Sequence, residues 1–187
     1  MSEKKIDTSL LDKAIKFAVE AHAGTERRGK GFPYVVHPLE AVAVAATITA
    51  DQELLAAAAL HDTVEDTDVT LDLINDEFGP RVASLVYVES DQDANEEWRS
   101  RKMKSIARLA GASRDAKIVA IGDKLSNMRA IARDYRVQGD KLWSMFHAPG
   151  GKPDHEWHYR QLAAALKDLE GTDAYEEFVC LIEKTFA

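Results

Sequence analysis

The chain has 187 residues, of which 45% are hydrophobic and 30% charged, as is typical of a globular protein that folds as one domain. A formal net charge of −8 argues against nonspecific binding to nucleic acid or to a membrane, because both need a basic protein surface. Cys180 is the only cysteine, which excludes a disulfide within the chain and favours a reducing cytoplasm. The first residues lack the apolar core of a signal peptide, and the longest apolar runs, 41–50 and 54–60, are too short to span a bilayer.

Nearly every segment has the apolar periodicity of a helix, and no useful stretch shows the alternation of a β-strand. We expect a polar loop at 23–36, a turn at 89–95 and a break at 148–153, where Gly and Pro cluster. The expected helices cover residues 10–21, 38–49, 51–62, 70–79, 80–88, 96–110, 113–135, 142–146, 154–169 and 174–186. The sequence therefore predicts an all-α fold. Because only 34 residues follow Pro153, we interpret the break as a loop inside a single domain that covers residues 1–187.

The pair His61-Asp62 stands at the end of the apolar run 54–60, where both side chains are costly to bury without partners. A divalent metal ion offers both a common partner, since imidazole nitrogens and carboxylate oxygens are usual ligands. His37 at a helix start and Asp123 after the apolar residues 118–122 supply a third and a fourth candidate ligand. A salt bridge from Asp123 to a nearby basic residue, Lys124 or Arg129, is the structural alternative.

Two acids, Glu65 and Asp66, follow the His-Asp pair after an interval of two residues. Beside a metal they are candidates for proton transfer, whereas without one they would be solvated acids at the start of a loop. Glu65 is the better candidate to deprotonate a water molecule. Asp66 could orient Glu65 or a ligand, or protonate a leaving oxygen.

A second group of residues could bind an anionic ligand. Arg27, Arg28 and Lys30 cluster before His37, either as phosphate or base contacts or as a solvated basic loop. Asn127 lies four residues after Asp123 and therefore on the same helical face. Arg129, six residues after Asp123, points elsewhere and suits a structural salt bridge.

With these residues the sequence resembles the HD-domain phosphohydrolases, specifically the hydrolase domain of the RelA/SpoT alarmone enzymes. The resemblance is strongest over about residues 15–132, and helices in 138–187 would complete the domain. The motifs that carry it are residues 22–24 (His-Ala-Gly), 27–29 (Arg-Arg-Gly), 33–39, which contain His-Pro, 58–67, which contain His-Asp and Glu-Asp, 78–82 and 122–129. With no room for the further domains of the long family members, the chain looks like a small, stand-alone alarmone hydrolase.

The resemblance implies a helical HD-domain fold that binds one divalent metal, commonly Mn²⁺. The ligands that it implies are His37, His61, Asp62 and Asp123. It also implies that Glu65 and Asp66 are the catalytic acids, that Arg27 stacks on the base, and that Arg28 and Asn127 contact the nucleotide. Tyr34 could line the pocket or merely pack beside Pro33.

The sequence departs from the family pattern at several positions. Gly122 stands where the family usually has alanine, and Ser126 where it usually has histidine. The segment 87–90 and Ala130 also differ from the usual residues. His22 could support the site or be an ordinary histidine at a helix end. His147, His155 and His158 could reach substrate phosphates, and the sequence does not rank them.

The leading hypothesis is metal-dependent hydrolysis of guanosine tetra- or pentaphosphate at its 3′-pyrophosphate, which yields pyrophosphate and GDP or GTP. One alternative is an HD phosphatase of another nucleotide: an adenosine alarmone, NADPH or a nucleoside monophosphate. A regulatory module that keeps the metal fold without turnover is a third hypothesis, against which the Glu65-Asp66 pair argues. The expected partner is thus a small phosphorylated nucleotide in the cytoplasm, and the sequence gives no oligomeric state.

Overall fold

The computed structural model describes residues 6–90 and 96–187, and helices make up most of these two ranges. The helices are α1 (Ser9–Ala21), α2 (Val36–Ala45), α3 (Gln52–Leu60), α4 (Thr63–Asp66), α5 (Leu71–Phe78), α6 (Pro80–Glu89), α7 (Trp98–Ala110), α8 (Arg114–Gln138), α9 (Lys152–Ala165) and α10 (Asp173–Phe186), with 3₁₀ turns η1 (Gly139–Met145) and η2 (Lys167–Leu169). The predicted all-α fold is confirmed within the described ranges. Of the turn expected at 89–95, residues 91–95 lie outside them, as do residues 1–5 of the predicted domain.

Side chains that accept hydrogen bonds from backbone N–H groups fix the start of several helices. Asp51, Thr70 and Ser113 cap α3, α5 and α8 at the positions where the sequence predicts these helices to begin. Gly79 separates α5 from α6 with a φ of +88°, which glycine adopts without strain, and Pro80 then begins α6.

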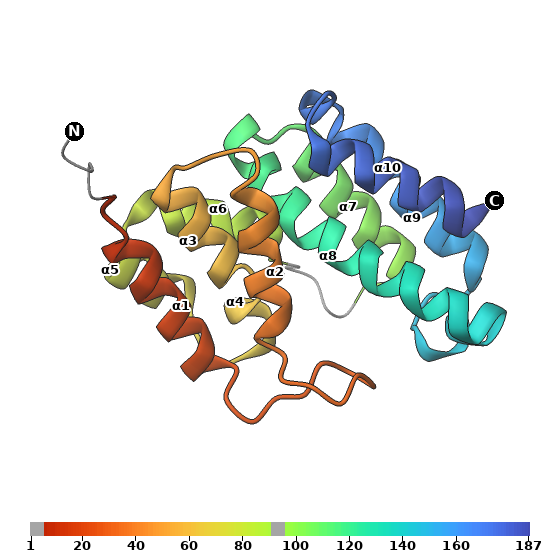
Figure 1. Cartoon of the computed structure of the whole chain (residues 1–187), viewed down its shortest axis with the longest axis horizontal. Coiled ribbons are helices and arrows are strands. Elements are labelled where there is room, and N and C mark those ends of the chain that lie inside the picture. Colours follow the sequence, from red (N-terminus) through yellow and green to blue (C-terminus); the bar gives the residue numbers. More distant parts are fainter. Residues whose placement is uncertain (1–5, 91–95) are drawn as a thin grey trace, which may run out of the picture.

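Helix α8 is the long central element of the molecule (Figure 1). α2 packs along it on one side, next to α3 and α1, and α10 and α9 lie on the other side (Figure 1). Leu125 and Met128 of α8 are fully buried, as are Leu60 of α3 and Phe178 of α10. Full burial of each such side chain stabilises the fold by about 1.5–3 kcal/mol. The core thus holds α2, α3 and α8 rigidly at the place where the candidate ligands lie.

Several helices differ at their ends from the sequence prediction, and two of these differences are breaks inside an expected helix. The helix expected over 51–62 stops at Leu60, and after His61 and Asp62 a separate short helix, α4, begins at Thr63. The Thr63 hydroxyl donates to the Leu60 carbonyl across this break. The helix expected over 154–169 divides into α9 and η2. The first of these breaks turns His61 and Asp62 toward the same point.

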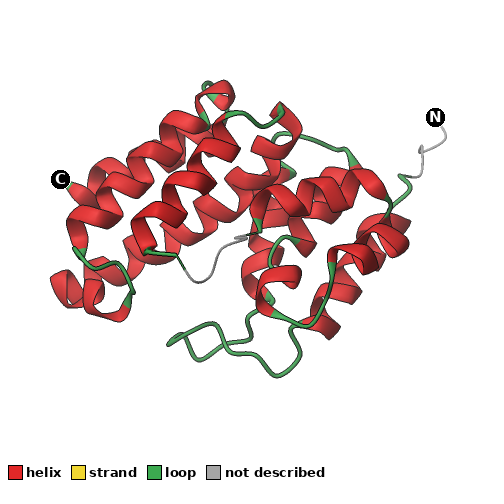
Figure 2. Ribbon diagram, turned by 180° about the vertical axis from the view of Figure 1, so that it is seen from behind, coloured by secondary structure: helices red, strands yellow, loops and turns green. Residues whose placement is uncertain are grey.

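The polar loop before α2 is folded back on itself, and Figure 2 shows it as the long loop that extends from the helices. A single antiparallel bridge joins Glu26 to Pro33, and the Arg27 N–H donates to the Phe32 carbonyl at 2.9 Å. The basic residues of the loop are therefore held by backbone hydrogen bonds. Within the two described ranges, no helix is both long and apolar enough to cross a membrane.

Candidate active site

A cleft of about 430 Å³ lies between the basic loop, α4 and the C-terminal helices. Nine of the ten site residues that the sequence predicts line it: Arg27, Arg28, Tyr34, His37, Asp62, Glu65, Asp66, Asp123 and Asn127. The tenth, His61, is buried and contacts two of the others. Residues far apart in the sequence therefore meet in one place.

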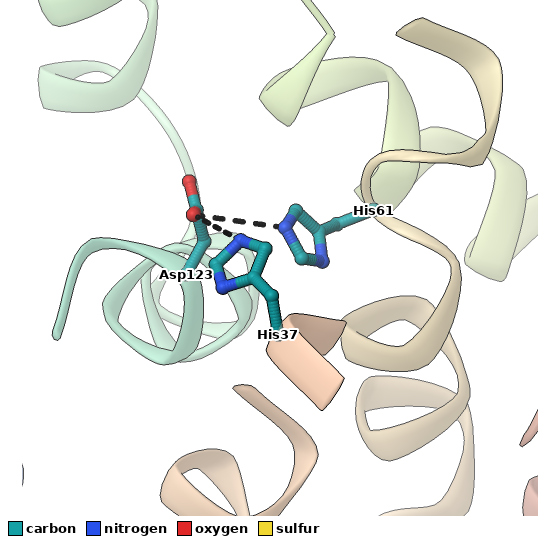
Figure 3. A group of neighbouring side chains, drawn as sticks. All are labelled: His37, His61 and Asp123. Atoms are coloured by element: carbon teal, nitrogen blue, oxygen red, sulfur yellow. Dashed lines mark ion pairs between the residues drawn. The ribbon is translucent and has the colours of Figure 1, made fainter. Parts of the chain in front are cut away.

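Three of the predicted metal ligands form a tight buried group. His37 comes from the first turn of α2, His61 from the end of α3 and Asp123 from the middle of α8, as Figure 3 shows. One ligand atom from each lies within 4.8 Å of the others. His37 Nε2 lies 3.1 Å and His61 Nε2 3.6 Å from Asp123 Oδ1. This is a geometry in which all three side chains could hold a single ion.

Asp62 also faces this group. Its Oδ2 atom lies 3.0 Å from His61 Nε2 and 3.3 Å from His37 Nε2. The Tyr34 hydroxyl donates to the same Oδ2 atom at 2.7 Å. Tyr34 therefore holds the Asp62 carboxylate as well as lining the cleft.

Hydrogen bonds on the far side of each imidazole orient the two histidines. His61 Nδ1 lies 2.9 Å from the Ala58 carbonyl, which only a protonated Nδ1 can bind, and His37 Nδ1 lies 2.8 Å from Ser126 Oγ. The Nε2 atoms are thereby directed at the carboxylates. Within the described part of the chain, the buried His61 Nε2 atom has no hydrogen-bond partner of acceptable geometry. A buried imidazole nitrogen that faces carboxylates and makes no hydrogen bond is suited to bind a metal ion.

The electrostatics of the group also suit a cation. Burial lowers the pKa of His61, but Asp62 and Asp123 outweigh burial and hold this pKa well above its usual range. Burial raises the pKa of the Asp123 carboxyl, but the Lys124 ammonium and the two histidines bring it well below its usual range. Against burial, which raises it, the pKa of the Asp62 carboxyl is likewise lowered by the two histidines, and two ionised carboxylates that are largely shielded from water need positive charge beside them. Two nitrogen and two oxygen donors with this charge fit a divalent metal ion.

Lys124 pairs with Asp123 at the Oδ2 atom, 2.5 Å away, and also with Glu89 at 2.9 Å. The salt bridge predicted as the alternative for Asp123 is therefore present through one carboxylate oxygen, and the other oxygen faces the two histidines. Asn127 donates its amide to the Oδ1 atom. This supports the prediction that Asn127 and Asp123 share one face of α8.

The predicted acids and the basic loop lie around this centre. Glu65 and Asp66 are exposed on α4 and line the cleft. Arg27 donates to Asn127 Oδ1 at 2.5 Å, and its guanidinium lies 5.1 Å from the centre of the Tyr34 ring. Of the other two basic residues, Arg28 contacts His147 and Lys30 pairs with Asp134. The loop is thus attached to the body of the protein.

The remaining histidines differ in whether they line the cleft. His155 and His158 of α9 line the cleft, whereas His147 lies outside its lining and contacts Arg28. His22 is buried at the end of α1, and its ring packs against that of Tyr34 with 4.8 Å between centroids. Arg129 points away from the cleft and pairs with Glu40 and Glu177, so the structural salt bridge predicted for it is confirmed.

Sequence reasoning missed several residues of the cleft wall. Trp98 and Lys102 of α7 and Glu89 of α6 line the cleft. Trp98 contacts His155 edge-on, with 5.9 Å between ring centroids. The position of α7 against α9 brings these residues to the site, and local periodicity carries no information on that contact. A cluster of Trp and His on two predicted helices was the only available signal.

The HD domain family matches residues 14–148 of this chain. Among curated proteins, the chain is 35% identical over 174 residues to guanosine-3′,5′-bis(diphosphate) 3′-pyrophosphohydrolase MESH1 of Homo sapiens, and this similarity covers 87% of the chain and 94% of the relative. It is 34% identical to the Mus musculus protein of the same name over the same shares. A probable GTP pyrophosphokinase of Mycobacterium leprae is 31% identical over 95% of the chain, which spans only 23% of that relative's length.

Solved structures show the same fold. A metazoan ortholog of SpoT, described as hydrolysing ppGpp, superposes with a TM-score of 0.80 at 24% identity over 97% of this chain and 98% of that one. A Listeria monocytogenes protein gives a TM-score of 0.72 at 25% identity over 80% of this chain and 98% of its own. The chain therefore belongs to the HD-domain family, among the relatives of the RelA/SpoT hydrolase type that its motifs predict.

Proposed function

We propose that this protein is a metal-dependent hydrolase that removes the 3′-pyrophosphate from guanosine tetra- or pentaphosphate and releases GDP or GTP. The observation that carries the proposal is the meeting of the four candidate ligands with Glu65 and Asp66 at one cleft. Its similarity to MESH1, a guanosine-3′,5′-bis(diphosphate) 3′-pyrophosphohydrolase of nearly the same length, supports this choice of substrate.

Four side chains would hold the ion: His37, His61, Asp62 and Asp123. When bound, a divalent cation there would lower the pKa of a water molecule and withdraw charge from phosphorus. We expect Mn²⁺, and other divalent ions fit the same nitrogen and oxygen donors.

Glu65 would orient the attacking water and accept its proton, because it lines the cleft close to Asp62 in the sequence. The water oxygen would form a bond to the phosphorus that carries the 3′ oxygen, and the bond between that phosphorus and the 3′ oxygen would break. Asp66 would give the 3′ oxygen its proton. The products are pyrophosphate and a nucleotide with a free 3′-hydroxyl.

The basic loop would bind the rest of the nucleotide. The Arg27 guanidinium already lies over an aromatic ring, and a planar guanidinium stacks on a purine in the same manner. Asn127 would contact the ribose or base beside it, and Arg28 the phosphates. The overall charge of −8 makes such a local basic cluster necessary for a highly anionic substrate. On composition alone we expect a cytoplasmic protein without nucleic-acid or membrane partners.

The test is product analysis with purified protein, Mn²⁺ and a panel of phosphorylated nucleotides. We expect pyrophosphate from guanosine tetraphosphate, and we expect chelation or the Asp123→Asn substitution to abolish its release. Release of orthophosphate from another nucleotide would favour an HD phosphatase instead. Metal-loaded protein that leaves every nucleotide intact would contradict the proposal, and turnover that persists unchanged in Asp123→Asn would remove Asp123 from the ligand set.

A further inference from the structure

A chain of hydrogen bonds leads from His37 away from the cleft. His37 Nδ1 lies 2.8 Å from Ser126 Oγ, and the Ser126 hydroxyl donates to Glu40 Oε2 at 2.8 Å. Because the serine proton is directed at Glu40, Ser126 Oγ is free to accept a hydrogen bond from a protonated Nδ1. The two bonds together select the tautomer in which Nε2 carries the lone pair that faces Asp123.

Glu40 is in turn held by an arginine from α8. Arg129 Nη1 donates to Glu40 Oε1 at 3.2 Å. The same guanidinium binds Glu177 of α10 with two bonds, from Nε at 2.7 Å and from Nη2 at 2.6 Å. Two-bond pairs of this kind fix the orientation of the guanidinium plane and are stronger than a single hydrogen bond.

The order of these residues on the helices makes the chain of bonds possible. His37 and Glu40 are three residues apart on α2, and Ser126 and Arg129 are three apart on α8. Each pair therefore lies on one face of its helix, and the two faces meet where α2 packs on α8. Glu177 extends the connection to the C-terminal helix, beyond residues 14–148 that match the HD domain family.

We infer that Ser126 and Glu40 are positioning residues for His37, and that Arg129 and Glu177 hold Glu40 in place from α8 and α10. This inference rests on the proposed role of His37 as a metal ligand. Outer partners of ligating histidines fix the ring and raise its basicity, and their loss typically lowers metal affinity about 10-fold to 100-fold. Ser126 acquires a role here at a position where the family pattern usually has another residue.

The experiment measures Mn²⁺ binding directly, from the electron paramagnetic resonance signal of free Mn²⁺ in titrations of purified full-length variants. We expect Ser126→Ala to raise the dissociation constant about 10-fold to 100-fold. Glu40→Gln and Glu177→Gln should have successively smaller effects, because Glu40 is two hydrogen bonds from the ring and Glu177 is four. At saturating Mn²⁺, Ser126→Ala should keep the wild-type KM for nucleotide, whereas the Mn²⁺ concentration for half-maximal rate should rise in step with the dissociation constant.

Two matched controls separate positioning from a general loss of stability. Ser90→Ala removes another buried serine hydroxyl, which donates to the Val86 carbonyl of α6. Glu183→Gln removes another α10 carboxylate, which pairs with Arg160. Both should leave Mn²⁺ affinity unchanged, and thermal melting without metal shows whether each variant folds.

The inference is overturned if folded Ser126→Ala and Glu40→Gln proteins bind Mn²⁺ as the wild type does. It is equally overturned if the Ser90→Ala control weakens binding as much as Ser126→Ala. Because the titration contains no nucleotide, wild-type protein that binds Mn²⁺ but releases no pyrophosphate contradicts the proposed function and leaves the positioning of His37 separately measurable.

Discussion

The α-carbon of Gly122 faces the backbone of Ala41 so closely that a β-carbon at position 122 would lie 2.6 Å from the Ala41 carbonyl oxygen. Gly122 precedes Asp123 on α8, and Ala41 lies one turn after His37 on α2. This contact therefore sets the helix separation across which the two proposed ligands meet.

Gly122→Ala should destabilise the protein and weaken Mn²⁺ binding. The overpacking cost of about 1–3 kcal/mol exceeds the gain of about 1 kcal/mol from replacing a helical glycine, because backbone atoms cannot yield cheaply. Urea unfolding and metal titration measure the two effects. The matched control is Gly111→Ala, where the nearest atom to an added β-carbon is 3.8 Å away and stability should not fall. A Gly122→Ala protein with wild-type stability and affinity would contradict the prediction.

Tyr34→Phe should weaken metal binding without unfolding the site. The change removes the 2.7 Å hydrogen bond to Asp62 but keeps the ring that packs on His22. A hydrogen bond to a charged group contributes about 1.5–3 kcal/mol, so we expect a Mn²⁺ dissociation constant roughly 10-fold higher. Tyr175→Phe loses a 3.1 Å bond to the Ala163 carbonyl, and because neither residue lines the cleft it should bind Mn²⁺ as the wild type does. Equal affinities for all three proteins would show that Tyr34 does not hold Asp62 for the metal.

Replacement of the proposed acids should slow the reaction and leave the affinity for the metal ion unchanged. Glu65→Gln and Asp66→Asn should each lower kcat about 100-fold or more, since a positioned acid or base contributes about 10²–10⁴ in rate. Mn²⁺ titration should give the wild-type dissociation constant. Asp68→Asn, at an exposed acid two residues further on, is the control. A normal kcat in either variant would remove that residue from the chemistry.

Arg27 and Asn127 should act together in substrate binding, because Arg27 donates to Asn127 Oδ1 at 2.5 Å. We expect Arg27→Ala and Asn127→Ala each to raise KM with a smaller change in kcat. In the double variant the effects should not add, with a coupling energy of about 0.5–3 kcal/mol. The exposed Arg136 provides a control arginine on α8. Strict additivity of the two substitutions would argue that their contact does not matter for the ligand.

Acid should destabilise the fold through His158. Burial, with Lys102 and Lys124 nearby, lowers the pKa of His158 to about 3, whereas an unfolded histidine titrates near 6.5. Between these values the unfolded chain binds a proton that the folded protein does not, so stability is lost as the pH falls below about 6.5. One such group should lower the unfolding free energy by about 1 kcal/mol between pH 7.5 and 5.5.

Urea unfolding at the two pH values checks this prediction. In His158→Gln, the loss of stability between pH 7.5 and 5.5 should be smaller than in the wild type by about that amount. The neighbouring His155 has a pKa lowered in the same direction by burial, so part of the acid sensitivity should remain. An identical pH dependence in the two proteins would show that His158 takes up a proton in the folded state.

The sequence predicted most of the helices and the side chains that meet at the centre of the cleft, for a physical reason. Helix periodicity and caps such as Asp51 and Ser113 are local, and buried charges such as Asp123 stand out in an apolar run. The short helix α4 was not predicted, because a helix of four residues is too short to show an apolar period.

Contacts between helices could not be predicted from one sequence. The bond from His37 to Ser126 depends on how α2 crosses α8, and the position of Trp98 in the cleft depends on how α7 packs on α9. Local helix propensity gives no information on either of these two helix contacts. The roles of Arg28 and of the residues of α9 toward a nucleotide stay predictions for the same reason.

Helix α10 has a practical consequence for anyone who seeks a minimal version of this protein. A fragment trimmed at residue 148, where the family match stops, would retain every proposed ligand and both acids. It would nevertheless uncover the side of α8 on which α10 rests and remove Phe178 and Ile182 from the interior. We expect such a fragment to aggregate through this exposed apolar surface, although it contains all the sequence motifs.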